Sequence, residues 1–457
     1  MKSSALRRCL LLAMAALLCL SVGCGAPAAN TGSADPAPTA TAAPAPTPTE
    51  TPIPDVKLGD LSVSPDAAEL DASGVPAAVL LPGLTQLSML ERLELGDTEL
   101  SAAELAELAE TYPQLDVHYS VSVLGKSVPC DAQTLDLGGL TAAQLPEALS
   151  ALERLSALEY VELVGGGSPV TALSMADVKA VQQAAPNARV NAVFDFYGQA
   201  VSTLDERVEF DGVEIGQENA QDVRDLLDVL QCCSYFKLAD AGIDNETMAD
   251  IRDSYPDTKV VWRVYFGEYF HCLTDEESIR AIFALDDTNC ENLKYCTDVK
   301  YMDIGHDDNL SDVSFVAYMP KLEICIVSGS QVEDISYFAN CPELQWLELV
   351  WCGYVKDLSG LENCKKLAYL NICYTQVKDL SPLDDCPLER FMYYVPKVDS
   401  AQQQEFIDKH PDCWTNFDGE NPYVLGWRYN DQGYTWCDMY LKVREVFDYA
   451  HNYYNHS

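Results

Sequence analysis

A hydrophobic segment recurs every 21 to 23 residues in the C-terminal half of the chain, and it constrains the fold more than any other feature. The five copies are VKYMDI from Val299, LEICIV from Leu322, LQWLEL from Leu344, LAYLNI from Leu367 and LERFMY from Leu388. The same period separates the aspartates that follow the first four copies, which are Asp312, Asp334, Asp357 and Asp379. Because one such unit cannot bury its apolar face alone, consecutive units must stack, which predicts a solenoid of short parallel strands.

The N-terminal half repeats with a longer period. Strand-like segments begin at Leu90, Leu158 and Cys233, and a helical pattern that stops at a proline follows each of them. The three prolines are Pro113, Pro186 and Pro256. A proline disfavours helix at the residue before it, so each helix should end there. Alternating strands about a glycine come next and predict a hairpin. With a further strand and helix, each long unit should contain strand, helix, strand, helix and hairpin.

The regular repeats resemble the leucine-rich repeats of bacterial surface proteins, in particular the 22-residue internalin type. The resemblance rests on the Leu-x-x-Leu-x-Leu strands and the DLSPL-like returns. The Asn that usually follows the strand is often lost, and Ser330, Tyr354 and Thr375 lie near that place. The resemblance implies an α/β leucine-rich-repeat solenoid with a curved parallel sheet. One sheet shared by all repeats, with helices outside it, is favoured over unrelated domains, although the sequence leaves its continuity open. We expect irregular long repeats over 57–290, regular repeats over 291–396 and an aromatic-rich C-terminal cap over 397–457.

The N-terminus has the features of an export signal. Basic residues, an apolar run from Cys9 to Leu20 and then small residues indicate a signal peptide over 1–23. The segment from Ser21 to Cys24 resembles the lipobox of bacterial lipoproteins, with Ser21 in place of the usual aliphatic residue. The resemblance implies cleavage before Cys24 and lipidation of its thiol; ordinary secretion with an incidental Cys24 is the alternative. Residues 24–56 include a Pro-, Ala- and Thr-rich linker that buries too little surface to fold. We therefore expect a folded body anchored to a membrane outside the cytoplasm.

The charge of the chain excludes several classes of function. It has 29 Lys and Arg residues against 71 Asp and Glu residues. Binding to nucleic acid or to an anionic membrane surface requires clustered basic residues, so neither is expected. The sequence contains no phosphate loop, no dinucleotide fingerprint and no Gly-x-Ser-x-Gly motif, and its six histidines show no ligand spacing. We therefore expect neither catalysis, nor a cofactor, nor a metal site.

Periodic cysteines and aspartates are the features that most resemble a chemical site. Cys341, Cys364 and Cys386 follow the repeat period and could form a metal ladder or disulfides. Met319 takes their place in the preceding unit, which favours buried free thiols. Two other disulfides stay open, namely Cys290 with Cys296 and Cys413 with Cys437. The periodic aspartates could hold calcium, but they are better explained as acceptors for backbone N–H groups at the start of each return.

Side chains that point away from the core form two rows along the strands. In LQWLELV the leucines point inward, whereas Trp346 and Glu348 point outward. Because exposed Tyr, Trp and Arg residues commonly anchor interfaces, these rows predict the ligand-binding surface. The predicted residues are Tyr160, Tyr235, Tyr301, Asp303, Trp346, Glu348, Tyr369, Asn371 and Arg390. The alternative is that insertions or the C-terminal cap cover this face, which would make the aromatic residues part of the core.

Together these features predict a lipid-anchored, non-enzymatic recognition module at a bacterial cell surface. Its ligand should be a protein or peptide bound on the concave strand face, and replacing Trp346 and Tyr369 by Ala should abolish binding while the fold stays intact. A glycan or cell-wall ligand stacked on the same aromatic row is the alternative, and an enzyme is the least favoured reading.

Overall fold

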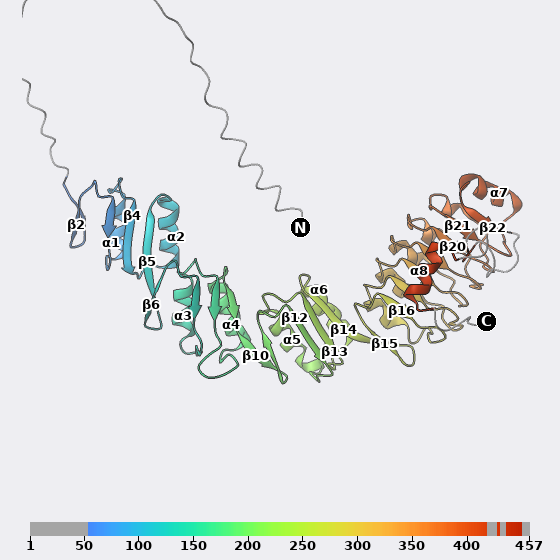
Figure 1. The fold of residues 1–457 in the computed structure, drawn as a ribbon, viewed down its shortest axis with the longest axis horizontal. Coiled ribbons are helices and arrows are strands. Elements are labelled where there is room, and N and C mark those ends of the chain that lie inside the picture. Colours follow the sequence, from blue (N-terminus) through green and yellow to red (C-terminus); the bar gives the residue numbers. More distant parts are fainter. Residues whose placement is uncertain (1–53, 418–426, 430–435, 450–457) are drawn as a thin grey trace, which may run out of the picture. The chain divides into compact units, whose positions relative to one another are not determined.

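The computed structural model describes residues 54–417, 427–429 and 436–449 (Figure 1). The predicted signal peptide, Cys24 and almost all of the linker lie outside the described residues. Within the described ranges, the helices are too short or too polar to cross a lipid bilayer.

The three long units have the predicted order of strand, helix, strand, helix and hairpin. A separate hairpin precedes them and consists of β1 (Val56–Leu58) and β2 (Leu61–Val63). The first unit contains β3 (Glu69–Asp71), α1 (Ala77–Leu84), β4 (Arg92–Asp97), α2 (Ala102–Thr111), β5 (Asp116–Val123) and β6 (Lys126–Pro129). The second unit contains β7 (Thr134–Asp136), α3 (Leu145–Leu152), β8 (Tyr160–Glu162), α4 (Met175–Ala184), β9 (Arg189–Asn191), β10 (Val193–Phe196) and β11 (Gln199–Ser202). The third unit contains β12 (Arg207–Asp211), η1 (Gln217–Asn219), α5 (Ala220–Leu227), β13 (Tyr235–Ala239), α6 (Asn245–Ser254), β14 (Lys259–Phe266) and β15 (Phe270–Leu273).

The second helix of each long unit begins and ends in the same way. The side chains of Ser101, Ser174 and Asp244 each accept a backbone N–H from the third residue of α2, α4 and α6. Each helix has ten residues and ends just before the predicted proline. A fourth copy, α7 (Ser400–Lys409), starts after the cap Asp399 and is followed by His410 and a proline. The pattern of the long units therefore returns after the regular repeats.

The regular repeats form a seven-stranded parallel sheet. Its strands are β16 (Ser278–Arg280), β17 (Tyr301–Asp303), β18 (Ile324–Ile326), β19 (Trp346–Glu348), β20 (Tyr369–Asn371), β21 (Arg390–Met392) and β22 (Trp414–Asn416). Short 3₁₀ helices lie between most of these strands, namely η2 (Glu291–Tyr295), η3 (Ser314–Tyr318), η4 (Ser336–Asn340), η5 (Ser359–Leu361) and η6 (Ser381–Leu383). The register pairs Tyr301 with Ile324, then Trp346, Tyr369 and Arg390, which confirms the predicted row of equivalent positions.

The long and regular repeats do not share one sheet, so the continuous sheet favoured by the sequence is wrong. In the described residues the parallel strands fall into separate groups, and each long unit includes an antiparallel hairpin. The break between the third long unit and the regular repeats has a local cause. The hairpin strand β15 pairs with the edge of β14 that a further parallel strand would need, and β16 pairs only with β17. One cluster of buried apolar side chains nevertheless extends from Val121 to Phe417, while the residues from Val56 to Leu108 form a cluster of their own.

The periodic cysteines and aspartates belong to the scaffold. The thiols of Cys341, Cys364 and Cys386 are buried and donate to backbone carbonyls of the preceding repeat at 3.4–3.6 Å. The fourteen cysteines in the described residues are free thiols, including those of both candidate disulfide pairs. Each periodic aspartate accepts the backbone N–H of the serine two residues later at 2.7–2.9 Å, and these pairs are Asp312 with Ser314, Asp334 with Ser336, Asp357 with Ser359 and Asp379 with Ser381. The structure therefore confirms that the periodic cysteines are buried thiols and that the periodic aspartates accept backbone N–H groups.

Residues of several types occupy the buried position that follows each strand by four residues. They are Asp307, Ser330, Cys352 and Thr375. Asp307 accepts the N–H groups of Ala284 and Leu285, while Thr375 donates to the carbonyl of Ile372. These side chains therefore provide hydrogen-bond partners for backbone groups that the usual Asn would otherwise bind. Tyr354 does not belong to this set, because its side chain is exposed.

Candidate binding site

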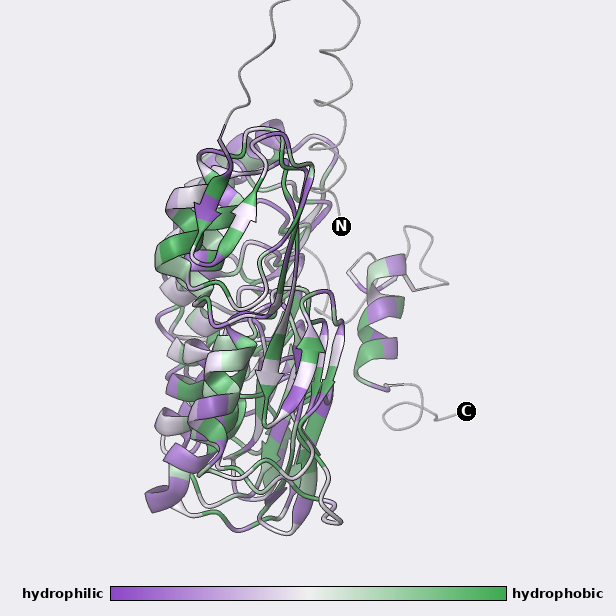
Figure 2. Cartoon of the chain, turned by 90° about the vertical axis from the view of Figure 1, so that its left-hand side faces the viewer, coloured by the Kyte–Doolittle hydropathy of each residue, from purple (hydrophilic) through white to green (hydrophobic). Residues whose placement is uncertain are grey.

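A C-terminal segment covers the outward face of the seven-stranded sheet. We call residues 427–429 and 436–449 the C-terminal strap; it includes α8 (Asp438–Val446). Figure 2 shows α8, close to the C-terminus, on the side of the strands. Trp427, Tyr440 and Val443 of the strap share a buried apolar cluster with Ile324, Trp346 and Met392 of the sheet. The strap therefore turns part of the outward face into a second core.

Four of the predicted ligand residues are buried beneath the strap, and not exposed as the sequence predicts. Asp303, Trp346, Glu348 and Asn371 are each no more than 2% exposed. The indole of Trp346 lies between Tyr369, 5.2 Å away, and Trp427, 4.7 Å away between ring centroids. The expectation that these four residues form an open surface is therefore wrong, because the non-repeating strap packs across them. Tyr301, Tyr369 and Arg390 in the same rows remain half-buried.

Tyr160 and Tyr235 lie apart from this region, on the sheets of the second and third long units. Both are half-buried and engaged locally. The hydroxyl of Tyr160 donates to Glu162 at 2.7 Å, and the guanidinium of Arg207 lies 3.6 Å above the ring of Tyr235. The sheet order therefore does not bring these two tyrosines together with the strap-covered residues.

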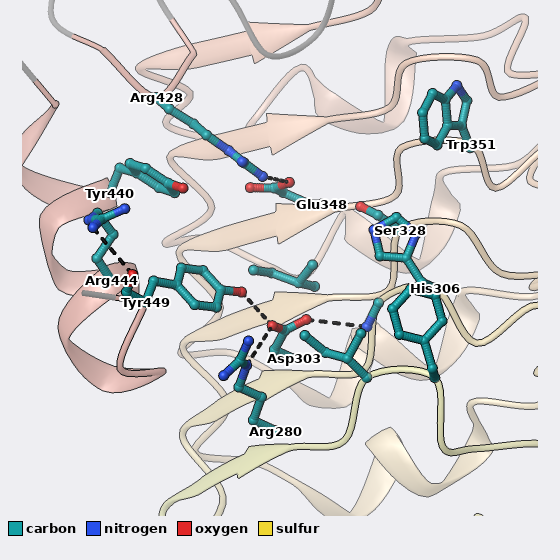
Figure 3. A pocket seen from close by; sticks show the side chains of 14 residues that line it. Arg280, Asp303, His306, Ser328, Glu348, Trp351, Arg428, Tyr440, Arg444 and Tyr449 are labelled. Carbon is teal, nitrogen blue, oxygen red and sulfur yellow. Dashed lines mark hydrogen bonds and ion pairs between the residues drawn. The ribbon is translucent and has the colours of Figure 1, made fainter. Parts of the chain in front are cut away.

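A pocket of about 410 Å³ lies between the strap and the sheet (Figure 3). Asp303, Ile326 and Glu348 line it from strands β17, β18 and β19. Arg428, Tyr440, Arg444 and Tyr449 line it from the strap. Figure 3 shows His306 and Trp351 on the side of the pocket away from Tyr440 and Tyr449. Phe283 and Arg280 also line the pocket, whose lining is both aromatic and charged. Such a volume and composition are typical of a small-ligand or side-chain pocket.

Ion pairs across the pocket neutralise its buried carboxylates. The guanidinium of Arg428 donates to Glu348 at 2.9 Å, and Arg280 lies 3.7 Å from Asp303. Asp303 also accepts hydrogen bonds from the hydroxyl of Tyr449 and the N–H of Gly305. Burial raises the pKa of Asp303, although the bond from Tyr449 opposes this rise. Because each carboxylate is held by an arginine, the arrangement suits binding better than acid–base chemistry.

Sequence reasoning missed a row at the end of the strands in which all but the half-buried Gly329 and Tyr374 are exposed, and we call this row the edge ladder. It consists of Phe283, His306, Gly329, Trp351, Tyr374 and Val395, each three residues after a strand of the seven-stranded sheet. Each has a positive φ, between 56° and 80°. Phe283 is 68% and Trp351 47% exposed. The ladder shares the repeat period, so carrying the register three residues past each strand would have found it.

Rings of the edge ladder contact one another in pairs, one stacked and one tilted. The rings of Phe283 and His306 lie 5.1 Å apart with their planes 16° apart. Those of Trp351 and Tyr374 lie 5.8 Å apart at 38°. The rings on neighbouring strands therefore form an aromatic surface beside the pocket. This surface differs from the row that contains Trp346, which the strap covers.

Comparisons with known proteins find similarity among solved structures. An internalin, InlF, from Listeria monocytogenes has 13% identity over 78% of this chain and 82% of its own, with a TM-score of 0.26. Internalin C2 from the same species has 17% identity over 30% of this chain and 69% of its own, with a TM-score of 0.24. A leucine-rich-repeat protein of Leptospira interrogans has 13% identity over 77% of this chain and 96% of its own, with a TM-score of 0.28. No family model and no curated protein matches. With one strand for each 21- to 23-residue repeat in a parallel ladder, the chain has a leucine-rich-repeat fold.

Proposed function

We propose that this chain is a lipid-anchored, extracytoplasmic recognition protein of a bacterial surface that binds a protein or peptide. The observation that carries the proposal is the edge ladder, an exposed row of large side chains beside a pocket. Solenoids commonly use extended surfaces of this kind to bind partners. Of the residues predicted from the sequence, Tyr160, Tyr235, Tyr301, Tyr369 and Arg390 keep partial exposure and remain candidate ligand contacts.

The backbone conformation of the ladder supports a role in binding. A left-handed conformation costs a residue with a side chain about 1–2 kcal/mol, and glycine avoids this cost. The chain nevertheless places Phe283, His306, Trp351 and Tyr374 at such positions, and the ring of each contacts that of a neighbour. Strain that is retained with large exposed side chains is a reason to infer function. Exposed aromatic residues in a row are also the type that anchors protein interfaces.

The proposed tether follows from the N-terminal sequence. Cys24 would carry the lipid, and the Pro-, Ala- and Thr-rich linker would hold the folded body away from the membrane. Cys24→Ser should move the protein from the membrane fraction to the soluble fraction of the cells that export it. Retention of Cys24→Ser on the membrane after a salt wash would contradict lipid anchoring.

The binding proposal is tested with the body from Val56 onward and extracts of surface proteins. Chemical crosslinking followed by mass spectrometry should identify a protein joined to residues next to the edge ladder. The double variant Phe283→Ala/Trp351→Ala should lose that crosslink. Met89→Ala/Tyr269→Ala is the matched control, because those side chains are 59% and 81% exposed elsewhere on the chain. Equal crosslinking in the two double variants, or retention on purified polysaccharide in place of protein, would contradict the proposal.

A further inference from the structure

The edge ladder is interrupted once, at Gly329. This residue has the φ of the ladder, 80°, but no side chain. Rings stand at the ladder positions of both neighbouring strands, His306 before it and Trp351 after it. An open groove of about 780 Å³ is lined by His306, Gly329 and Trp351 together with polar residues of the same loops. We call the part of the groove between His306 and Trp351 the glycine slot.

The strand spacing makes the slot wide enough for one planar group between the rings of His306 and Trp351. Neighbouring strands lie about 4.8 Å apart, so ladder positions two strands apart are separated by about 9.6 Å. A flat group in contact with a ring on each side needs roughly 7 Å, at about 3.5 Å for each contact. A side chain at position 329 would narrow this space from its floor, and its Cβ would meet the His306 imidazole at 3.1 Å, so that the ring would have to shift.

Both walls of the slot are supported from behind. Phe283 stacks on His306 on one side, and Tyr374 packs against Trp351 on the other. These contacts restrict the rotation of the wall rings before any ligand arrives. A pre-organised slot loses less conformational entropy on binding than two mobile side chains would.

The chemistry of the groove favours a cation. Besides the two rings and the glycines, its lining contains Asp308, Ser330, Gln331 and Tyr354, and among the described residues no Lys or Arg lines it. Asp308 is exposed. The chain as a whole carries a formal charge of −42, which attracts basic partners over long distances.

We propose that the glycine slot receives the guanidinium of an arginine side chain from the protein or peptide ligand. A guanidinium is planar and permanently charged. It can stack on the rings of His306 and Trp351 and form an ion pair with the carboxylate of Asp308. A lysine ammonium has the charge without the flat shape. A tyrosine ring or a sugar has the shape without the charge. This inference rests on the proposed function and specifies the part of the ligand that the edge ladder recognises.

The test uses fluorescently labelled dodecapeptides and the body from Val56 onward, with anisotropy measured at 150 mM salt. The peptide (Gly-Arg)6 should bind at least fivefold more tightly than (Gly-Lys)6, which has the same charge. It should also bind at least tenfold more tightly than (Gly-citrulline)6, which has the same planar shape but no charge. The lysine peptide reports binding that depends only on the overall charge, so the ratio of the two affinities isolates the slot.

Filling the slot should remove the arginine preference. Gly329→Tyr places in the slot a side chain of the kind found at the equivalent Tyr374, and it should bring the Arg-to-Lys ratio close to one without changing the affinity for the lysine peptide. Trp351→Leu removes one aromatic wall and should lower the ratio independently, which keeps the test decisive if Gly329→Tyr does not fold. Tyr269→Leu replaces an exposed ring outside the edge ladder, so it is the matched control and should keep the wild-type ratio.

Three outcomes would overturn the inference. The first is equal binding of the arginine and lysine peptides to the wild-type body. The second is an arginine preference that survives in Gly329→Tyr and Trp351→Leu. The third is tighter binding of a neutral probe, (Gly-Tyr)6 or chitotetraose, that Gly329→Tyr abolishes. In each case the proposed function still stands if the protein crosslink depends on Phe283 and Trp351, so a failure of this inference is distinguishable from a failure of the proposed function.

Discussion

The guanidinium of Arg428 donates a hydrogen bond to the carboxylate of Glu348 at 2.9 Å, although 80 positions separate the two residues. Glu348 belongs to β19 and Arg428 to the C-terminal strap, so this ion pair between a buried carboxylate and a half-buried guanidinium joins the strap to the sheet. A second ion pair, between Lys442 of α8 and Glu323 at 2.6 Å, joins the same two parts with greater exposure. The strap is therefore fixed to the sheet by charge as well as by apolar contact.

Removing one partner of the buried pair should destabilise the protein. Glu348→Ala leaves the Arg428 guanidinium without its carboxylate in a buried place, and breaking such a pair costs about 3–5 kcal/mol of unfolding free energy. Glu333→Ala is the matched control, because its pair with Lys356 is mostly exposed and should contribute less than about 1 kcal/mol. Urea unfolding measures both variants. A similar loss in the two would show that solvent reaches the Arg428–Glu348 pair.

Trp346→Ala should also destabilise the protein, in contrast to the expectation from sequence that it affects binding alone. Trp346 is fully buried among Tyr369, Trp427 and Tyr440. Truncating a buried Trp typically costs about 3–5 kcal/mol. Trp351→Ala removes an indole that is 47% exposed and should cost about 1 kcal/mol or less.

The readout for this pair of variants is again urea unfolding. If Trp346→Ala kept wild-type stability and lost only ligand binding, the strap would not cover the sheet in solution, and the exposed-row interpretation would be right after all.

The difference between these two tryptophans shows what the sequence could and could not predict. The repeat period correctly predicts that Leu347 faces inward and Trp346 outward, because alternation along a strand determines the side. It does not predict what lies over the outward face. An exposed binding row and a buried contact with the strap use the same aromatic residues, and the strap itself has no repeat to align. Burial of Trp346 therefore depends on a tertiary contact that no local pattern records.

The scaffold residues were predictable for the opposite reason. Asp357 and Cys364 make contacts within their own repeat or with the adjacent one, so the period alone places their partners. The edge ladder was missed because what repeats there is the backbone conformation, while the side chains change from Phe283 to His306, Gly329 and Trp351. A search for repeated residue types cannot find a repeated φ.

Asp307 should make stability depend on pH. Its carboxylate accepts two backbone N–H groups through Oδ1, while the buried Oδ2 has no hydrogen-bond partner among the described residues. Burial raises the pKa of Asp307 to about 6. Because the folded protein then holds this proton more tightly than the unfolded chain, its contribution to stability falls as pH rises from about 4 to about 6 and levels off above that.

Asp307→Asn keeps the accepting oxygen and removes the charge, so it should be more stable than the wild type by about 1–2 kcal/mol at pH 7 and by much less at pH 4. Urea unfolding across this range measures the difference. Asp308→Asn, at the exposed neighbouring position, controls for the loss of one negative charge. A wild-type-minus-variant difference that is constant between pH 4 and 7 would contradict the assignment to Asp307.

The thiols of Cys272 and Cys296 should form a disulfide when the protein is oxidised. Their sulfur atoms lie 3.5 Å apart, which is about 1.5 Å more than a disulfide bond of about 2.05 Å. Oxidised glutathione can first react with the half-exposed Cys272 and release one reduced glutathione; the Cys296 thiolate then displaces the second. The hydrogen bond with Cys272 and burial both raise the pKa of Cys296 in the reduced protein, and burial remains after Cys272 has reacted, so the second step should be slow and should accelerate at higher pH.

Alkylation followed by mass spectrometry measures this reaction. Treatment with oxidised glutathione should leave two fewer alkylated cysteines than in the reduced protein and yield one crosslinked peptide pair containing Cys272 and Cys296. Closing a loop of this length stabilises a folded protein by about 3 kcal/mol when the geometry is unstrained, so the oxidised form should unfold at higher urea concentration. Cys272→Ser should prevent both changes. A crosslink from Cys290 to Cys296 in the wild type would instead mean that the segment around η2 rearranges before the thiols react.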